Sequence, residues 1–287
     1  MRQEPPQCGV ADNDPLQRVK LPRNARSLFN RTNLTTEALG SLAFQGRPRD
    51  LELVGIRELH ASLFTRLETL KNRKQRAQQF LDYMAVHFRL EAPEEAGYTT
   101  DSRIQRNKVD YQKILRGWLF NPDGREAAVL KGWVASRFGL LPRHHEGPLD
   151  DPESEPYLRF LSMQSAGLFN TNALESQLDV LYAFCQYELK RRFSDQDHWL
   201  LFRGVNQIDQ YDLLQREPGG RAVVLLNNLN SFSEDRERAD EFGDYILEAR
   251  IPLSKIMFFH GLLPGAFKGE GEVMVIGGLY EVLLHTY

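Results

Sequence analysis

The chain has 287 residues, of which 41% are hydrophobic and 26% charged, and its formal net charge is −3. That size allows one large or two ordinary domains with a sizeable core, and the charge gives no reason to expect nucleic acid or an acidic membrane surface as a partner. No segment approaches the ~20 apolar residues of a membrane span, the N-terminus lacks the apolar stretch of a signal peptide, and the two cysteines, Cys8 and Cys185, suit a reducing compartment, so we expect a cytoplasmic protein.

The N-terminal part of the chain predicts a polar segment followed by helices. Residues 1–48 are rich in Pro, Arg and Asn, so we expect an extended segment that wraps a surface rather than forming a core. From Arg49 onward, apolar residues recur at spacings of three and four, as in amphipathic helices. Helices are therefore expected at residues 56–70, 77–88, 111–120, 127–138 and 172–192, with loops at 91–101 and 142–156.

The character of the sequence changes at His198. Short runs rich in Val, Ile, Leu and Phe are separated by Gly, Pro and Asn, and they predict strands at 199–203, 222–226, 245–250, 256–259, 272–276 and 280–285. Helices first and strands afterwards indicate an α+β fold, with a mostly helical N-terminal half packed on a mixed or antiparallel β-core. We divide the chain into the segment 1–48, a helical region 49–195 and a β-rich core 196–287, of which the last two could form one continuous domain.

Polar motifs interrupt the strand-rich part in a fixed order. Arg203 follows an apolar run, Ser231-Phe232-Ser233 is a Ser-x-Ser motif, and Glu270-Gly271-Glu272 is a Glu-x-Glu motif. Each motif alone occurs by chance in many proteins, but the ordered combination is more specific. It resembles the Arg-Ser-Glu signature of mono-ADP-ribosyltransferases, which split NAD and transfer its ADP-ribose to a protein side chain. In that family, a Glu two residues before the last Glu marks the enzymes that modify arginine.

The chemistry of NAD cleavage suits these residue types. Arg203 would hold the pyrophosphate, because a guanidinium group is always charged and binds phosphate oxygens in pairs, and Gly204 would let the backbone approach NAD closely. Glu272 would stabilise the oxocarbenium-like transition state at the ribose and hold its 2′-hydroxyl. Glu270 would orient the acceptor arginine and accept its proton, since alternate residues of a strand share one face.

The serine motif and two aromatic residues complete the predicted site. Ser231 would hold the strands and Glu272 by hydrogen bonds, and Ser233 would position the ribose next to the nicotinamide or the following loop. Phe242 could pack near the nicotinamide ring or lie in the core. Phe232 stands where the family usually has Thr, and we expect it in the core.

A closer resemblance covers the chain from about Leu21 to the C-terminus. Residues 115–120 (LRGWLF), 124–126, 129–134 (VLKGWV), 136–140 and 161–204 are similar to the NAD:dinitrogenase-reductase ADP-ribosyltransferases of nitrogen-fixing bacteria. This resemblance implies a transferase that moves ADP-ribose from NAD, its co-substrate, to a surface arginine of dinitrogenase reductase and so reversibly switches off nitrogen fixation. It also implies a PII-type signal protein as regulator. We expect no metal.

Two other functions stay open. An NAD glycohydrolase would use water in place of the acceptor, although water needs no partner such as Glu270. A catalytically inactive binding module would use the helical half as an adaptor, although the intact motifs argue against loss of activity. Failure to bind or consume NAD would favour the second of these.

Other polar residues favour structural roles. His144, His145 and Glu146 could suggest a metal, but they lie in a Pro-rich loop without a partner cluster. His198 and His260 flank strands and could reach NAD, although a structural role is favoured. The basic run from Arg66 to Arg76 fits a solvated helix face or a contact with an acidic protein. Trp118 and Trp133 lie on apolar helix faces, so we expect both in the core.

Overall fold

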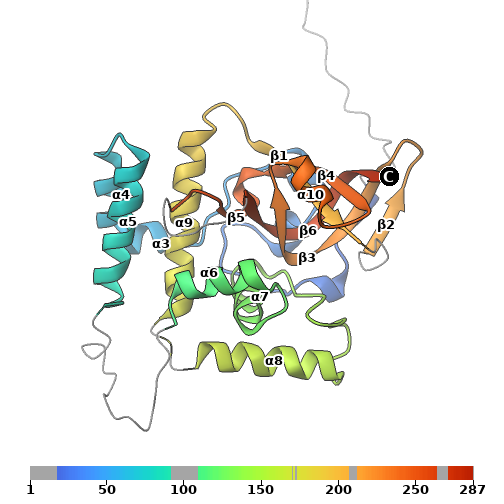
Figure 1. Cartoon of the computed structure of the whole chain (residues 1–287), viewed down its shortest axis with the longest axis horizontal. Coiled ribbons are helices and arrows are strands. Elements are labelled where there is room, and N and C mark those ends of the chain that lie inside the picture. The colour runs from blue at the N-terminus through green and yellow to red at the C-terminus, as the bar shows by residue number, and fades with distance from the viewer. Residues whose placement is uncertain are drawn as a thin grey trace, which may run out of the picture.

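The chain folds into helices followed by one antiparallel sheet. The computed structural model describes residues 18–91, 109–169, 171, 173–206, 212–263 and 271–286. Helices make up most of the part before residue 196 and strands most of the rest, so the predicted α+β class is confirmed (Figure 1). No described helix is long and apolar enough to span a membrane. One hydrophobic cluster extends from Leu21 to Leu284 through helices and sheet, and the division at residue 196 stays a prediction.

The longer helices lie beside and beneath the sheet, and the short α10 lies over the strands (Figure 1). Figure 1 shows α9 between the α4–α5 pair and the sheet, with α7 between α8 and the strands. Their bounds are α1 (Thr36–Leu39), α2 (Leu42–Gly46), α3 (Ile56–Leu59), α4 (Ala61–Glu68), α5 (Arg73–His87), α6 (Tyr111–Phe120), α7 (Arg125–Phe138), α8 (Glu155–Leu168), α9 (Leu174–Arg192) and α10 (Arg236–Asp240), with short 3₁₀ turns at Arg23–Ala25 and Leu253–Lys255.

Most predicted helices are present, and their deviations have local causes. α6 has the predicted bounds, and α5, α7 and α9 differ from prediction by a few residues. The predicted helix 56–70 is divided into α3 and α4 at His60, which is buried and lies 2.8 Å from the Tyr83 hydroxyl. α8 was not predicted, because the Pro-rich stretch that ends at Pro156 is typical of a loop. Proline is favoured in the first turn of a helix, and here Ser154 caps that turn by accepting a hydrogen bond from the Tyr157 N–H.

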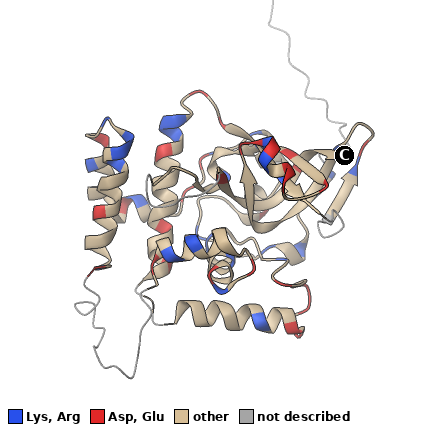
Figure 2. Cartoon of the chain, viewed as in Figure 1, with Lys and Arg blue, Asp and Glu red and all other residues tan. Residues whose placement is uncertain are grey.

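Two expectations about the N-terminal half need correction. In the described part of the segment 1–48, Leu39, Leu42 and Phe44 are buried, because α1 and α2 turn their few apolar residues inward. The basic run is not wholly a solvated face either. Lys and Arg gather at the ends of α5 and α9 that lie uppermost in Figure 2. Arg76, however, is 6% exposed and forms an ion pair with Glu188 of α9 at 2.6 Å.

The sheet has the strand order β2-β3-β1-β4-β6-β5. Because β3 also pairs with β6, a closed ring of paired strands is formed by β3, β1, β4 and β6. All its pairs are antiparallel. The strands are β1 (His198–Val205), β2 (Asp212–Arg216), β3 (Arg221–Ser233), β4 (Tyr245–Pro252), β5 (Ile256–Phe259) and β6 (Glu272–Thr286).

The predicted strands are present but two of them merge. The strands expected at 272–276 and 280–285 form the continuous β6, although Gly277 and Gly278 lie between them. A Cβ on Gly277 would lie 1.8 Å from the Asn227 carbonyl oxygen, and the Gly278 backbone has φ of +115°. Glycine here permits an irregular close pairing with β3 instead of ending the strand. β2 was not predicted, and β3 continues without a break from the strand predicted at 222–226 through the serine motif to Ser233.

Candidate active site

The serine and glutamate motifs meet on neighbouring strands. The register of β3 and β6 pairs Ser231 with Met274 and Ser233 with Glu272, the first residue of β6. The Ser231 hydroxyl donates a hydrogen bond to Oε1 of Glu272, across a sequence separation of 41 residues. The fold therefore brings together a hydroxyl and a carboxylate in the arrangement expected for Ser231. Glu270 lies outside the described residues.

Trp118 on α6 is a third member of this cluster, and its contact was not predicted. Its indole Nε1 lies 3.0 Å from Ser231 Oγ and 3.0 Å from Glu272 Oε1. The side chain is 2% exposed, so the expected core position is correct, but its polar atom faces the site. A buried tryptophan N–H usually needs an acceptor, and that requirement was the available signal in the sequence.

The surroundings of Glu272 act on its charge in opposite directions. Burial raises the pKa of the Glu272 carboxyl, since a low-dielectric environment disfavours the charged form. The hydrogen bonds from Ser231 and Trp118, and the nearby charge of Arg203, act to lower the same pKa. The donors therefore offset part of the cost of burying an ionised carboxylate.

Arg203 and Gly204 lie on β1 beside the serine motif. Nη1 of Arg203 donates a hydrogen bond to the Ser231 carbonyl oxygen at 2.6 Å. A Cβ on Gly204 would lie 1.9 Å from the carbonyl oxygen of Ala239 on α10 and 3.1 Å from Phe242 Cβ. The glycine is therefore required here by the close approach of α10 to the strand.

The remaining residues of the predicted site line the same end of the sheet. Ser233 Oγ accepts a hydrogen bond at 3.0 Å from the backbone N–H of Asp235, the residue that caps α10, so this serine shapes the loop after β3. Phe242 is 59% exposed, and this position leaves its ring available to a ligand. Phe232 is buried, as expected.

His198 and His260, the two histidines that flank strands, differ in their contacts and exposure. The His198 ring contacts the Gln45 carbonyl oxygen and Asp197, which fits the structural role. The backbone N–H of His260 donates to the Glu272 carbonyl oxygen at 2.8 Å, and its side chain is exposed. Among the described residues no group of three His, Cys, Asp or Glu could hold a metal ion. The expectation that no metal takes part stays a prediction.

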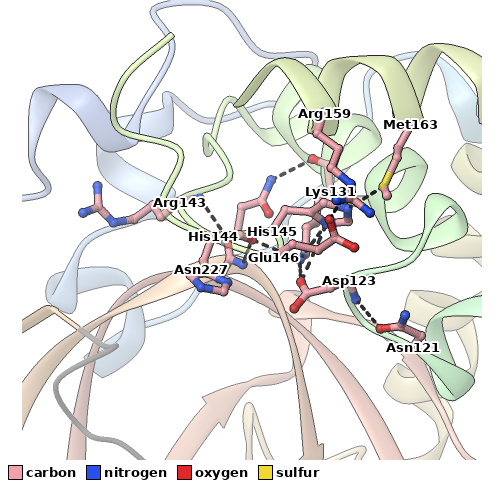
Figure 3. A network of polar contacts seen from close by, with 11 residues as sticks. Asn121, Asp123, Lys131, Arg143, His144, His145, Glu146, Arg159, Met163 and Asn227 are labelled. Carbon is pink, nitrogen blue, oxygen red and sulfur yellow. Dashed lines mark hydrogen bonds and ion pairs between the residues drawn. The ribbon is translucent and has the colours of Figure 1, made fainter. Parts of the chain in front are cut away.

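A buried charged network lies next to Trp118, since Lys131 Nζ is 6.0 Å from the centre of the Trp118 ring. Figure 3 shows the polar contacts of this network. Lys131 of α7 is 2% exposed, and its Nζ donates to Asp123 at 2.8 Å and to the His144 carbonyl oxygen at 3.0 Å. His145 Nδ1 lies 3.2 Å from the same Nζ. Burial, followed by the charge of Lys131, lowers the pKa of His145 to about 4, so this ring is neutral near pH 7. His144 and His145 thus belong to a structural network.

Comparisons with known proteins agree with these observations. A sequence model of the family described as dinitrogenase reductase ADP-ribosyltransferase matches residues 29–284. A protein of Rhodospirillum rubrum named NAD(+)--dinitrogen-reductase ADP-D-ribosyltransferase is 38% identical over 257 residues, which cover 88% of this chain and 93% of the relative. No solved structure matches the chain.

Proposed function

The chain belongs to the dinitrogenase reductase ADP-ribosyltransferase family, and we propose that it transfers ADP-ribose from NAD to an arginine of dinitrogenase reductase. The observation that supports this activity best is the cluster of Glu272, Ser231 and Trp118 beside Arg203. It combines a held carboxylate with a fixed cation, the two groups that cleavage of a charged dinucleotide requires. Modification of dinitrogenase reductase would switch off nitrogen fixation reversibly.

In the proposed reaction, one bond at the ribose breaks and another forms. The bond between the nicotinamide nitrogen and ribose C1 breaks, and its electron pair leaves with nicotinamide. Glu272 stabilises the positive charge that develops on the sugar and binds the 2′-hydroxyl. A guanidine nitrogen of the acceptor arginine forms the new bond to C1, and Glu270 accepts the proton that this nitrogen loses.

The other predicted residues have roles in NAD binding. Arg203 binds the pyrophosphate, and Gly204 allows the ligand and α10 to approach β1 closely. Ser231 holds the carboxylate of Glu272 in place. Ser233 shapes the loop that faces the ribose, and the exposed ring of Phe242 packs near the nicotinamide.

The experiment for this proposal is a labelling reaction. The purified chain is incubated with labelled NAD and dinitrogenase reductase, and the target is searched for ADP-ribose by mass spectrometry. A single adduct on an arginine is expected, and it should be lost with Glu272→Gln but retained with Glu281→Gln, which removes a carboxylate farther along β6. NAD consumption without an adduct would indicate the glycohydrolase, and absence of NAD binding would indicate an inactive module.

Two further parts of the proposal come from the sequence. Cysteine usage supports an enzyme that acts in the cytoplasm, and the family resemblance supports control of its activity by a PII-type signal protein. The helical region 49–195 covers the catalytic part 196–287 and shapes the surface that meets the protein substrate. Titration of the labelling reaction with a PII protein tests the regulator, because a change in rate is expected only if the two proteins interact.

A further inference from the structure

We propose that Trp118 is a positioning residue that holds Oε1 of Glu272 in place for NAD cleavage. The inference rests on the proposed function, since it concerns the same carboxylate. It starts from the indole Nε1, which lies 3.0 Å from Glu272 Oε1 and 3.0 Å from Ser231 Oγ. The tryptophan acts through Glu272 and needs no contact with NAD.

The two hydrogen bonds to the Glu272 carboxylate end on the same oxygen, Oε1. Ser231 and Trp118 both donate to Oε1 of Glu272, and no described residue donates to Oε2. Oε1 is therefore bound to the protein, while Oε2 is left for the ribose. An indole N–H can only donate, so it favours the ionised carboxylate over the protonated acid.

Helix packing gives Trp118 little freedom to move away. The neighbouring residue, Gly117, lies so close to α7 that a Cβ there would be 2.4 Å from side-chain atoms of Glu126. The side chain of Asp110 accepts a hydrogen bond from the Lys113 N–H at 2.8 Å and fixes the start of α6. The helix that carries the indole is thus held at its beginning and at its middle.

The buried network lies over the ring of the indole. Lys131 Nζ lies 6.0 Å from the centre of the Trp118 ring, within the range of a cation–π contact. Asp123, the His144 carbonyl oxygen and His145 Nδ1 surround this ammonium group and prevent its movement (Figure 3). The ring therefore has a fixed cation against it while its N–H points to the carboxylate.

Among the described residues, the charged group that acts on this carboxylate is Arg203. Arg203 on β1 acts to lower the pKa of Glu272, as do the bonds from Ser231 and Trp118, against the effect of burial. Lys131 on α7 lies over the indole ring, whose Nε1 contacts Glu272. Removal of the indole N–H alone should therefore raise the pKa of Glu272, because the other influences are retained.

Trp133 provides a matched control. It is also buried, it also lies on a helix of this half, and its Nε1 also donates to a carboxylate, that of Asp179, at 2.7 Å. Asp179 belongs to α9 and has no part in the proposed chemistry. Trp133→Phe therefore removes a comparable hydrogen bond and a comparable volume without touching Glu272.

The test compares Trp118→Phe with Trp133→Phe in the full chain. Cleavage of NAD is measured against pH, and the Glu272 carboxyl is titrated by carbon-13 NMR, with Glu272→Gln to identify its signal. A hydrogen bond to a charged group contributes ~1.5–3 kcal/mol, so Trp118→Phe should lower kcat roughly 10- to 100-fold with little change in the KM for NAD. The acid limb of the pH profile and the NMR titration should both move to higher pH, and neither should move in Trp133→Phe.

Other outcomes would overturn the inference. If Trp118→Phe lowers kcat but leaves the pKa of Glu272 unchanged in the NMR titration, Trp118 is a packing residue. The same conclusion follows if Trp118→Phe and Trp133→Phe shift the Glu272 titration equally. If Trp118→Phe fails to fold, benzothienylalanine at position 118 keeps the shape and replaces the N–H with sulfur, and the same readouts apply. The NMR titration needs no protein substrate. If the unmodified chain does not label dinitrogenase reductase, the proposed function fails while the titration still decides the role of Trp118.

Discussion

Arg203 donates a hydrogen bond from Nη1 to the backbone carbonyl oxygen of Ser231 at 2.6 Å. The hydroxyl of the same serine donates to Glu272. Ser231 therefore connects β1 to β6, through its backbone carbonyl on one side and its side-chain hydroxyl on the other. β1 and β3 otherwise pair only where Phe202 faces Ser233. The arginine thus stabilises the junction of the strands as well as carrying the charge proposed to bind NAD.

Arg203→Lys should show whether the hydrogen bond to Ser231 and paired binding of phosphate oxygens matter in addition to the positive charge. A lysine keeps the positive charge, but its single ammonium group cannot bind phosphate oxygens in pairs while it also reaches the Ser231 carbonyl. Loss of one charge-assisted hydrogen bond costs ~1.5–3 kcal/mol, so the Kd for NAD should rise roughly 10- to 100-fold. Calorimetric titration with NAD measures this change. Unaltered affinity would show that only the charge at this position matters.

Glu272→Gln should make the protein more stable at neutral pH. Burial raises the pKa of the carboxyl in the folded protein above its unfolded value. The contribution of Glu272 to stability is therefore present below the unfolded pKa, and it is lost as the pH rises through the folded one. Glutamine stays neutral and can still accept the bonds from Trp118 and Ser231.

Urea unfolding at several pH values checks this prediction. The free energy of unfolding of Glu272→Gln should exceed that of the unmodified chain at pH 7.5, and the difference should shrink as the pH approaches ~4.3, the ordinary value for glutamate. Glu281→Gln on the same strand is the control, because it removes an ion pair with Arg221 at 2.9 Å and should give no gain. A gain that is constant with pH would mean that ionisation of Glu272 is not its cause.

Much of the fold and the order of the motifs could be predicted because these features depend on local sequence. Apolar spacing predicted α6 with its observed bounds, and the segregation of helices and strands predicted the α+β class. Arg203, Ser231 and Glu272 could be selected because polar residues inside apolar strands are unusual. The structure places these three together, while their roles stay predictions.

The features that were missed depend on contacts between distant residues. Periodicity predicts that Trp118 is buried, but not that its N–H meets a carboxylate 154 residues later in the chain. A glycine pair such as Gly277-Gly278 predicts the end of a strand. Only the pairing of β3 with residues on both sides of this pair shows that β6 is continuous. Pro156 fits a loop as well as a first helical turn, and the cap at Ser154 decides between them.

Glu270→Gln should separate transfer from hydrolysis. Glutamine at this position cannot accept the proton of the acceptor arginine, so transfer to dinitrogenase reductase should fall by a factor of ~10²–10⁴. Hydrolysis of NAD in the absence of the protein substrate should remain within a few-fold, because water needs no such base and Glu272 is unchanged. Both activities are measured from labelled NAD. An equal fall of the two would assign Glu270 to NAD binding or to the shape of the site.

Gly204→Ala tests whether close packing of α10 on β1 forms the NAD site. The added methyl group would lie 1.9 Å from the Ala239 carbonyl oxygen, and a backbone atom cannot move aside as a flexible side chain can. Overpacking of this kind costs ~1–3 kcal/mol, and the displaced α10 would carry Phe242 away from the site. We therefore expect a lower free energy of unfolding together with weaker NAD binding.

Gly46→Ala is the matched control for this last prediction, because a Cβ added at Gly46 in α2 would meet no atom within 4 Å outside its chain neighbours and its own helix backbone. Its stability should change by no more than ~1 kcal/mol, and its affinity for NAD should not change. If Gly204→Ala loses stability but binds NAD normally, the close approach is needed only for packing. If Gly204→Ala retains both its stability and its affinity for NAD, α10 can shift without cost, and the close approach of α10 does not explain the glycine at this position. Only the combined loss links the contact between α10 and β1 to the binding of NAD.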